Sequence, residues 1–162
     1  MRKLRILLLF IVLFTLSSCG PNPGKFNDNL IENLNKADRE YTTFYALADQ
    51  YSDNDNFIIV TEKGKVTIKE MEELIKQINK YNTPKEGDDF KNLTVEYIKN
   101  MVNSVKGFTQ DEKLTKDQFE KALENMDKNE VKLNEIDNKI IEAQKSFASK
   151  RGFELKGVSS KK

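Results

Sequence analysis

Five apolar side chains recur every seven residues over the last third of the chain. They are Phe119, Met126, Leu133, Ile140 and Phe147. Seven residues make almost two turns of an α-helix, so these side chains lie along one side of it. A strict seven-residue repeat favours left-handed packing against neighbouring helices. The pattern predicts a long helix whose apolar stripe must be buried by other helices.

Both ends of this predicted helix carry residues that are typical of helix caps. Thr115 and Gln118 have the spacing of a capping box, in which each side chain bonds a free backbone N–H of the first turn. Gly152 follows the last turn, near Lys150, and is a natural C-cap. We therefore expect a helix from about 115 to 150, after which residues 153–155 could fold back on it.

An earlier stretch, from Lys25 to about Ser52, is also predicted to be an amphipathic helix. Its apolar residues are spaced by three or four and fall at Phe26, Leu30, Leu34, Ala37, Tyr41, Phe44, Ala48 and Tyr51. This spacing keeps them on one helical face. The aromatic run Tyr41, Phe44, Tyr45 and Tyr51 could also be interpreted as a ligand site, but at helical spacing such residues are far more often core.

The segment 57–66 is ambiguous. Phe57-Ile58-Ile59-Val60 is apolar and β-branched, and a turn at Gly64 would pair it with the residues that follow as a small hairpin. Alternatively it forms the first turns of a helix that breaks near Gly64. Two short strands alone are marginal, which favours the helix. The well-marked helix begins at Thr67, which has capping-box spacing to Glu70.

A third amphipathic segment runs from Asp88 to about Val105. It follows the link 82–87 and places Phe90, Tyr97 and Met101 on one face. Four amphipathic helices joined by short links predict an all-α, antiparallel up-and-down four-helix bundle over residues 25–155. The segment 57–66 is its one irregular or hairpin candidate.

The first residues have the layout of an export signal. A basic start is followed by an apolar run from Ile6 to Leu16, which is too short to span a bilayer as a helix. Next comes Leu16-Ser17-Ser18-Cys19, which resembles the lipobox of bacterial lipoproteins. The resemblance implies that residues 1–18 are a signal peptide, with cleavage between Ser18 and Cys19 and a lipid on Cys19. A plain secretory signal with a coincidental cysteine is the alternative.

The segments flanking the predicted bundle are short. Residues 19–24 are interpreted as the lipidated cysteine and a linker, because two prolines and two glycines interrupt regular structure. Residues 156–162 are expected to be a disordered tail. In lipoproteins of Gram-negative bacteria, aspartate after the cysteine favours the inner membrane. Gly20 stands there, so outer-membrane or cell-surface placement in the envelope is expected if the cell has an outer membrane.

Charge and residue types exclude several functions. The chain has 27 basic and 26 acidic residues, of which the predicted signal holds three basic ones, so the mature chain has net charge −2. There is no basic stripe for nucleic acid. Without histidine, and with its one cysteine assigned to lipid, the chain lacks the usual zinc and copper ligands, and we expect no metal site and no cofactor. Weak calcium or magnesium binding by carboxylates alone is the alternative.

Carboxylate pairs are the remaining route to catalysis. Glu72-Glu73, Asp88-Asp89 and Asp111-Glu112 could suggest glycosidase chemistry. They stand at helix starts or on polar faces, where solvation explains them. A Ser–Lys nucleophile would have only Ser104 and Lys106, which are merely near in sequence. Asp53-Asn54-Asp55-Asn56 lacks the glycine and glutamate of an EF-hand loop.

Three short stretches resemble a family of helical surface lipoproteins of Bacteroidetes and spirochaetes. They are Phe26-Asn27-Asp28, Lys85-Glu86-Gly87-Asp88, and Ala143-Gln144-Lys145-Ser146-Phe147-Ala148 with Gly152-Phe153 after it. The resemblance implies a helical fold and an envelope location, and it implies no activity or catalytic residue.

The hypothesis is therefore a membrane-tethered envelope lipoprotein that is a non-enzymatic binding module. Its partners would be the membrane, through the lipid on Cys19, and a further protein or envelope component. An envelope hydrolase or carbohydrate-active enzyme that uses carboxylates is one alternative. A structural spacer of the envelope is the other.

Overall fold

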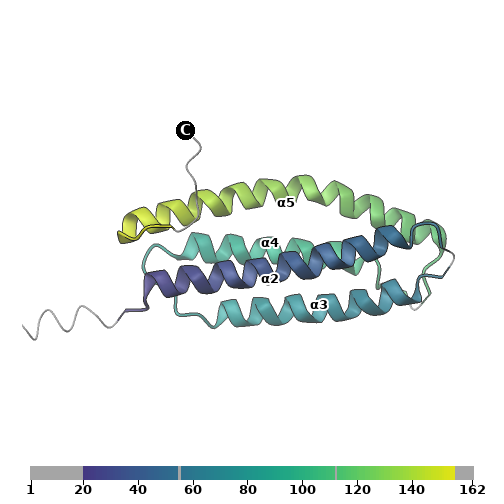
Figure 1. The fold of residues 1–162 in the computed structure, drawn as a ribbon, viewed down its shortest axis with the longest axis horizontal. Coiled ribbons are helices and arrows are strands. Elements are labelled where there is room, and N and C mark those ends of the chain that lie inside the picture. The colour runs from purple at the N-terminus through teal and green to yellow at the C-terminus, as the bar shows by residue number, and fades with distance from the viewer. Residues whose placement is uncertain (1–19, 55, 112, 156–162) are drawn as a thin grey trace, which may run out of the picture.

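The computed structural model describes residues 20–54, 56–111 and 113–155. Its four helices are α2 (Pro23–Gln50), α3 (Ile58–Asn79), α4 (Asp88–Lys106) and α5 (Lys116–Arg151). Successive helices run in opposite directions along one long axis (Figure 1). The predicted all-α, up-and-down four-helix bundle is confirmed. Cys19, the signal 1–18 and the tail 156–162 lie outside the described residues.

The helices do not contact one another equally. Each packs along its neighbour in sequence, and α2 also contacts α4 and α5. α3 and α5 lie on opposite sides of α2 and α4, and within the described residues their backbones do not approach each other closely (Figure 1). α5 is therefore held by α4 and, less extensively, by α2.

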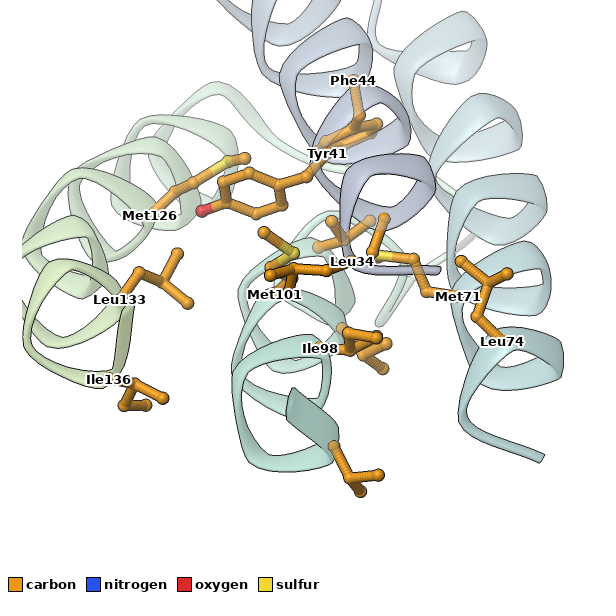
Figure 2. Close-up of a cluster of buried hydrophobic side chains, with 14 of the residues drawn as sticks. Leu34, Tyr41, Phe44, Met71, Leu74, Ile98, Met101, Met126, Leu133 and Ile136 are labelled. Carbon is orange, nitrogen blue, oxygen red and sulfur yellow. The ribbon is translucent and has the colours of Figure 1, made fainter. Parts of the chain in front are cut away.

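The predicted stripes form the core. Every member of the seven-residue repeat on α5 is buried, as are seven of the eight residues of the α2 stripe, Tyr51 being half-buried. Figure 2 shows side chains from all four helices meeting in one interior, with Leu34 and Tyr41 from α2, Met71 from α3, Met101 from α4 and Leu133 from α5. The aromatic residues of α2 thus belong to the core rather than to an open ligand site.

The first helix begins earlier than the composition of its linker predicts. α2 starts at Pro23, inside the segment interpreted as linker. Asn22 is its N-cap, and the side-chain Oδ1 of Asn22 accepts a hydrogen bond of 3.0 Å from the N–H of Lys25. Proline suits the first turn because the N–H that it lacks would be unbonded there anyway. Only residues 20–22 separate Cys19 from the bundle.

α3 is one continuous helix across the ambiguous segment. The predicted hairpin and the predicted break near Gly64 are both wrong, because Ile58–Asn79 is helical throughout. Gly64 is a site of close approach: a Cβ there would lie 2.8 Å from Cγ2 of Thr109 and 3.3 Å from Cε2 of Phe44. Glycine is favoured at this position by the close packing of two side chains, not by a turn.

The capping box predicted at Thr67 and Glu70 is also wrong. Thr67 lies in the middle of α3, fully buried, and its hydroxyl has no hydrogen-bond partner among the described residues. α3 starts well before it, where the N–H of Ile58 donates to Oδ1 of Asn56 at 3.1 Å. Apolar β-branched residues open this helix because tertiary packing overrides their strand preference.

The ends of α5 follow the prediction. The N–H of Gln118 donates to Oγ1 of Thr115 at 3.3 Å, and the N–H of Thr115 donates to Oε1 of Gln118 at 2.9 Å. Gly152 takes a left-handed conformation, with φ of 68°. The chain then folds back, so that the ring of Phe153 packs edge-on against Phe147 at 5.4 Å between centroids.

No helix among the described residues is both long and apolar enough to cross a membrane.

Candidate functional site

Three stretches that are far apart in the sequence meet at one end of the bundle. α2 begins there, α5 ends there, and the loop between α3 and α4 turns there (Figure 1). We call it the basal end, and the opposite end the distal end. The stretches starting at Phe26, Lys85 and Ala143, which carry the resemblance to helical surface lipoproteins, therefore share one place in the fold. No local pattern in the sequence indicates this convergence.

Four aromatic rings hold the basal end together. Phe26 packs edge-on against Phe147, with 5.6 Å between ring centroids, and against Phe90, with 6.5 Å. Phe147 in turn contacts Phe153, beyond the end of α5. Edge-on aromatic pairs of this kind are each worth about 0.5–1.5 kcal/mol beyond burial. The cluster fixes the end of α5 against the start of α2.

The loop before α4 fits closely against this cluster. A Cβ on Gly87 would lie 3.0 Å from Cε1 of Phe26 and 3.1 Å from the carbonyl oxygen of Pro84. Glu86 has a positive φ of 64°, which residues other than glycine rarely adopt. Its carboxylate lies 3.7 Å from the guanidinium of Arg151 on α5. The loop is thus tied to both terminal helices.

A chain of amides links α2 to α5 beside the aromatic rings. Nε2 of Gln144 donates to Oδ1 of Asn27 at 2.8 Å, and Nδ2 of Asn27 donates to a carboxylate oxygen of Asp28 at 3.2 Å. Asn27 is only 8% exposed, so its amide is committed to these partners. A buried amide that is hydrogen-bonded on both sides fixes the register of the two helices.

A groove of about 710 Å³ opens next to this amide pair. We call it the basal groove. It is lined by Gly24, Asn27, Asp28, Ile31, Glu32 and Asn35 of α2, and by Gln144, Phe153, Glu154 and Leu155 at the end of α5. Among the described residues the lining contains three carboxylates, three amides and three apolar side chains, but no lysine or arginine.

Glu32 is a charged member of this lining at neutral pH. A hydrogen bond of 2.6 Å from Nζ of Lys36 to Oε1 of Glu32 lowers the pKa of Glu32 below its ordinary value. Lys36 uses one oxygen of this carboxylate, which leaves Oε2 as an acceptor. Lys36 itself does not line the groove.

Two other grooves differ in charge from the basal one. The groove between α3 and α4, of about 400 Å³, is lined by Lys76, Lys99 and Lys106 together with Glu72. The groove between α2 and α3, of about 660 Å³, is lined by three basic and three acidic side chains. The basal groove is the largest of these three, and the charged side chains that line it in the described part of the chain are all acidic.

The carboxylate pairs singled out as catalytic candidates are dispersed. Glu72 lies 3.4 Å from Nζ of Lys106, and Glu73 lies 2.7 Å from Nζ of Lys76. Asp88 and Asp89 are exposed in the first turn of α4. A carboxylate oxygen of Asp111 accepts from Gln118, while Glu112 lies outside the described residues.

The two side chains of the Ser–Lys candidate, Ser104 and Lys106, each interact with other residues instead of with each other. Oγ of Ser104 accepts from Nδ2 of Asn129 at 2.7 Å and donates to the carbonyl of Asn100 at 3.2 Å. Lys106 faces Glu72 instead. Ser104 and Asn129 thus form a polar bridge between α4 and α5.

A half-buried carboxylate that the sequence does not single out lies between α2, α4 and α5. Burial raises the pKa of Asp38, a hydrogen bond with Tyr97 opposes the rise, and Asp137 adds to it. The pKa of Tyr97 is raised in turn by burial and by both carboxylates. Asp38 does not line the basal groove, so its shifted pKa belongs to the packing of the helices.

No group of three or more acidic, histidine or cysteine side chains in the described ranges is placed to hold a metal ion. No family model, no curated protein and no solved structure matches the chain. The resemblance to helical surface lipoproteins therefore stays a prediction.

Proposed function

We propose that the protein is a lipid-anchored, non-enzymatic binding module of the cell envelope and that its binding site is the basal groove. The observation that carries the proposal is the groove itself. It is a hollow of about 710 Å³ with carboxylates, amides and apolar side chains at the end of a well-packed bundle. Ligand sites are usually concave and partly apolar, with a few polar groups that set orientation.

Binding explains this lining better than catalysis does. Among the described residues the lining has no hydroxyl, thiol or amine nucleophile, and two of its three carboxylates are already bonded, Asp28 by Asn27 and Glu32 by Lys36. Its buried amide, Asn27, is held by Gln144 and Asp28, so it orders the wall and is not free to activate a substrate. The remaining properties of the groove are its negative charge and its concave shape, and both suit the recognition of a ligand.

The proposed anchor sets where the groove would be. A lipid on Cys19 would be three residues from Asn22, the N-cap of α2. Three extended residues span at most about 11 Å. The basal end would thus be held close to the membrane, at the outer membrane or cell surface in a Gram-negative cell. α2 has 28 residues, so the distal end would project away by about 42 Å, the length of a helix of that size.

Fractionation of cells that express Cys19→Ser tests the anchor. We expect this variant to leave the membrane fraction while keeping the helical circular dichroism of the parent. Gly20→Asp is the matched control, because it changes the residue beside the lipid without removing the sulfur, and it should remain membrane-bound. A mature N-terminus without acyl chains in the mass spectrum of the parent protein would refute the proposal.

A further inference from the structure

We propose that the ligand of the basal groove is a short, extended peptide segment that carries lysine or arginine beside an apolar side chain. The inference rests on the proposed binding function and names the class of its ligand.

Charge is the first argument. Asp28, Glu32 and Glu154 contribute three carboxylates to the groove, and no basic side chain among the described residues lines it, although Lys36 pairs with Glu32 from outside the groove. Oε2 of Glu32 is available, because Lys36 bonds Oε1. Carboxylates bind ammonium and guanidinium groups through short charge-assisted hydrogen bonds, and complementary charge selects the right partner. An anionic ligand would be repelled from the same wall.

The apolar part of the lining is the second argument. Ile31, Phe153 and Leu155 are half-buried and line the same groove as the carboxylates. Phe153 is fixed by its edge-on contact with Phe147 and by the left-handed turn at Gly152. A wall that is already ordered loses little freedom when a ligand binds. The ligand therefore needs an apolar group as well as positive charge.

The length of the groove sets the length of the segment. Along α2 the lining extends from Gly24 to Asn35. This part of the helix rises by about 16 Å. An extended chain covers such a distance with about five residues. Asn35 of α2 lines the groove with its amide, and Gln144 of α5, whose Nε2 is bonded to Asn27, keeps its Oε1 as an acceptor, so both can offer hydrogen bonds to the peptide backbone.

The chain itself contains a segment with the same chemistry. Directly after Leu155, which lines the groove, the sequence continues with Lys156-Gly157-Val158-Ser159-Ser160-Lys161-Lys162. Three lysines and a valine in this short stretch match the ligand class inferred above. A test must therefore separate a peptide supplied by a partner from this segment of the same molecule.

Fluorescence anisotropy of two labelled synthetic peptides provides the test, with the full mature chain purified in a zwitterionic detergent. The first peptide is Lys-Val-Lys-Leu-Lys and the second is its charge-reversed form, Glu-Val-Glu-Leu-Glu. We expect the basic peptide to bind, more weakly as salt is raised, and the acidic peptide not to bind.

The double variant Glu32→Gln, Glu154→Gln removes two carboxylates with almost no change in volume. We expect it to bind the basic peptide about fivefold more weakly, as the loss of two exposed ion pairs implies. Glu135→Gln, on the exposed side of α5 and outside the groove, is the matched control and should bind as the parent does.

Equal binding of both peptides, or no effect of the double variant, would overturn the inference. Binding that appears only after residues 156–162 are deleted would also overturn it, because the occupant would then be the chain's own segment. These outcomes are independent of the anchor, since Cys19→Ser fractionation reports on the proposed function and peptide binding reports on the ligand.

Discussion

The ring of Phe57 lies almost flat on the ring of Phe119, with 4.1 Å between centroids and 13° between planes. Phe57 precedes α3 and Phe119 lies in the first turn of α5, so the stack joins the start of α3 to the start of α5 at the distal end. Phe108 packs edge-on against the same Phe119 ring at 5.4 Å. Aromatic clusters thus close the bundle at both ends, and the basal groove lies beside the aromatic rings of the basal end.

Truncating this stack should cost much stability. Phe119 is fully buried, so Phe119→Ala leaves a cavity and removes both ring contacts. We expect the free energy of unfolding to fall by about 3–5 kcal/mol, the usual cost of such a truncation. Urea unfolding followed by circular dichroism measures it. Val131 lies on the same helix and is 65% exposed, so Val131→Ala should change the free energy by less than about 0.5 kcal/mol.

Gly64→Ala separates helix propensity from packing. Propensity alone predicts a gain of about 1 kcal/mol in a continuous helix. The new methyl group would lie 2.8 Å from Cγ2 of Thr109, so we expect a loss of about 1–3 kcal/mol instead. Thr109→Ser removes the methyl group of Thr109, so the double variant should recover part of the loss in a double-mutant cycle. A more stable Gly64→Ala protein would contradict the observed packing.

Helices were predictable where their signals are local. The seven-residue repeat of α5, its capping box at Thr115 and its C-cap at Gly152 all depend on residues within a few turns of one another. α4 begins at Asp88, as predicted, and ends one residue after Val105. For the same reason the number of helices and their stripes followed from spacing alone.

The predictions that failed, or could not be made, concern contacts between residues that are far apart in the sequence. Gly64 resembles a helix break in the sequence because the residue that it contacts, Thr109, lies beyond the far end of α4. The amide pair at the basal groove joins Asn27 to Gln144 across 117 positions. Neither interaction leaves a local pattern, and so the groove could not be located from the sequence.

The carboxyl of Glu70 should make the stability of α3 against α2 depend on pH. A hydrogen bond with Glu40 raises the pKa of Glu70 above its ordinary value of 4.5, while Lys63 opposes the rise. A raised pKa means that the folded chain holds the proton more tightly than the unfolded chain. The stabilisation is therefore complete below the ordinary pKa and is lost as pH rises through the raised pKa.

We therefore expect Glu70→Gln to raise the melting temperature near neutral pH, because the amide keeps the hydrogen bond to Glu40 without the second negative charge. The gain should shrink as the pH is lowered toward 4.5, where Glu70 itself is protonated. Glu73→Gln is the matched control with the opposite sign, since Lys76 lowers the pKa of Glu73. A neutral-pH gain from both substitutions would refute this account.

Thr67→Val distinguishes the observed helix from the predicted capping box. In the structure the hydroxyl of Thr67 is fully buried and has no hydrogen-bond partner among the described residues. Such a state costs about 1–3 kcal/mol. Valine has nearly the same shape and removes the hydroxyl, so the free energy of unfolding should rise by about 1 kcal/mol.

A capping role for Thr67 would give the opposite result, a loss of about 1 kcal/mol. Urea unfolding of Thr67→Val and Thr115→Val side by side decides between the two. Thr115 is the N-cap of α5 in the structure, so the second variant should lose stability while the first gains it. If both lost stability equally, a helix start at Thr67 would be favoured over the continuous α3.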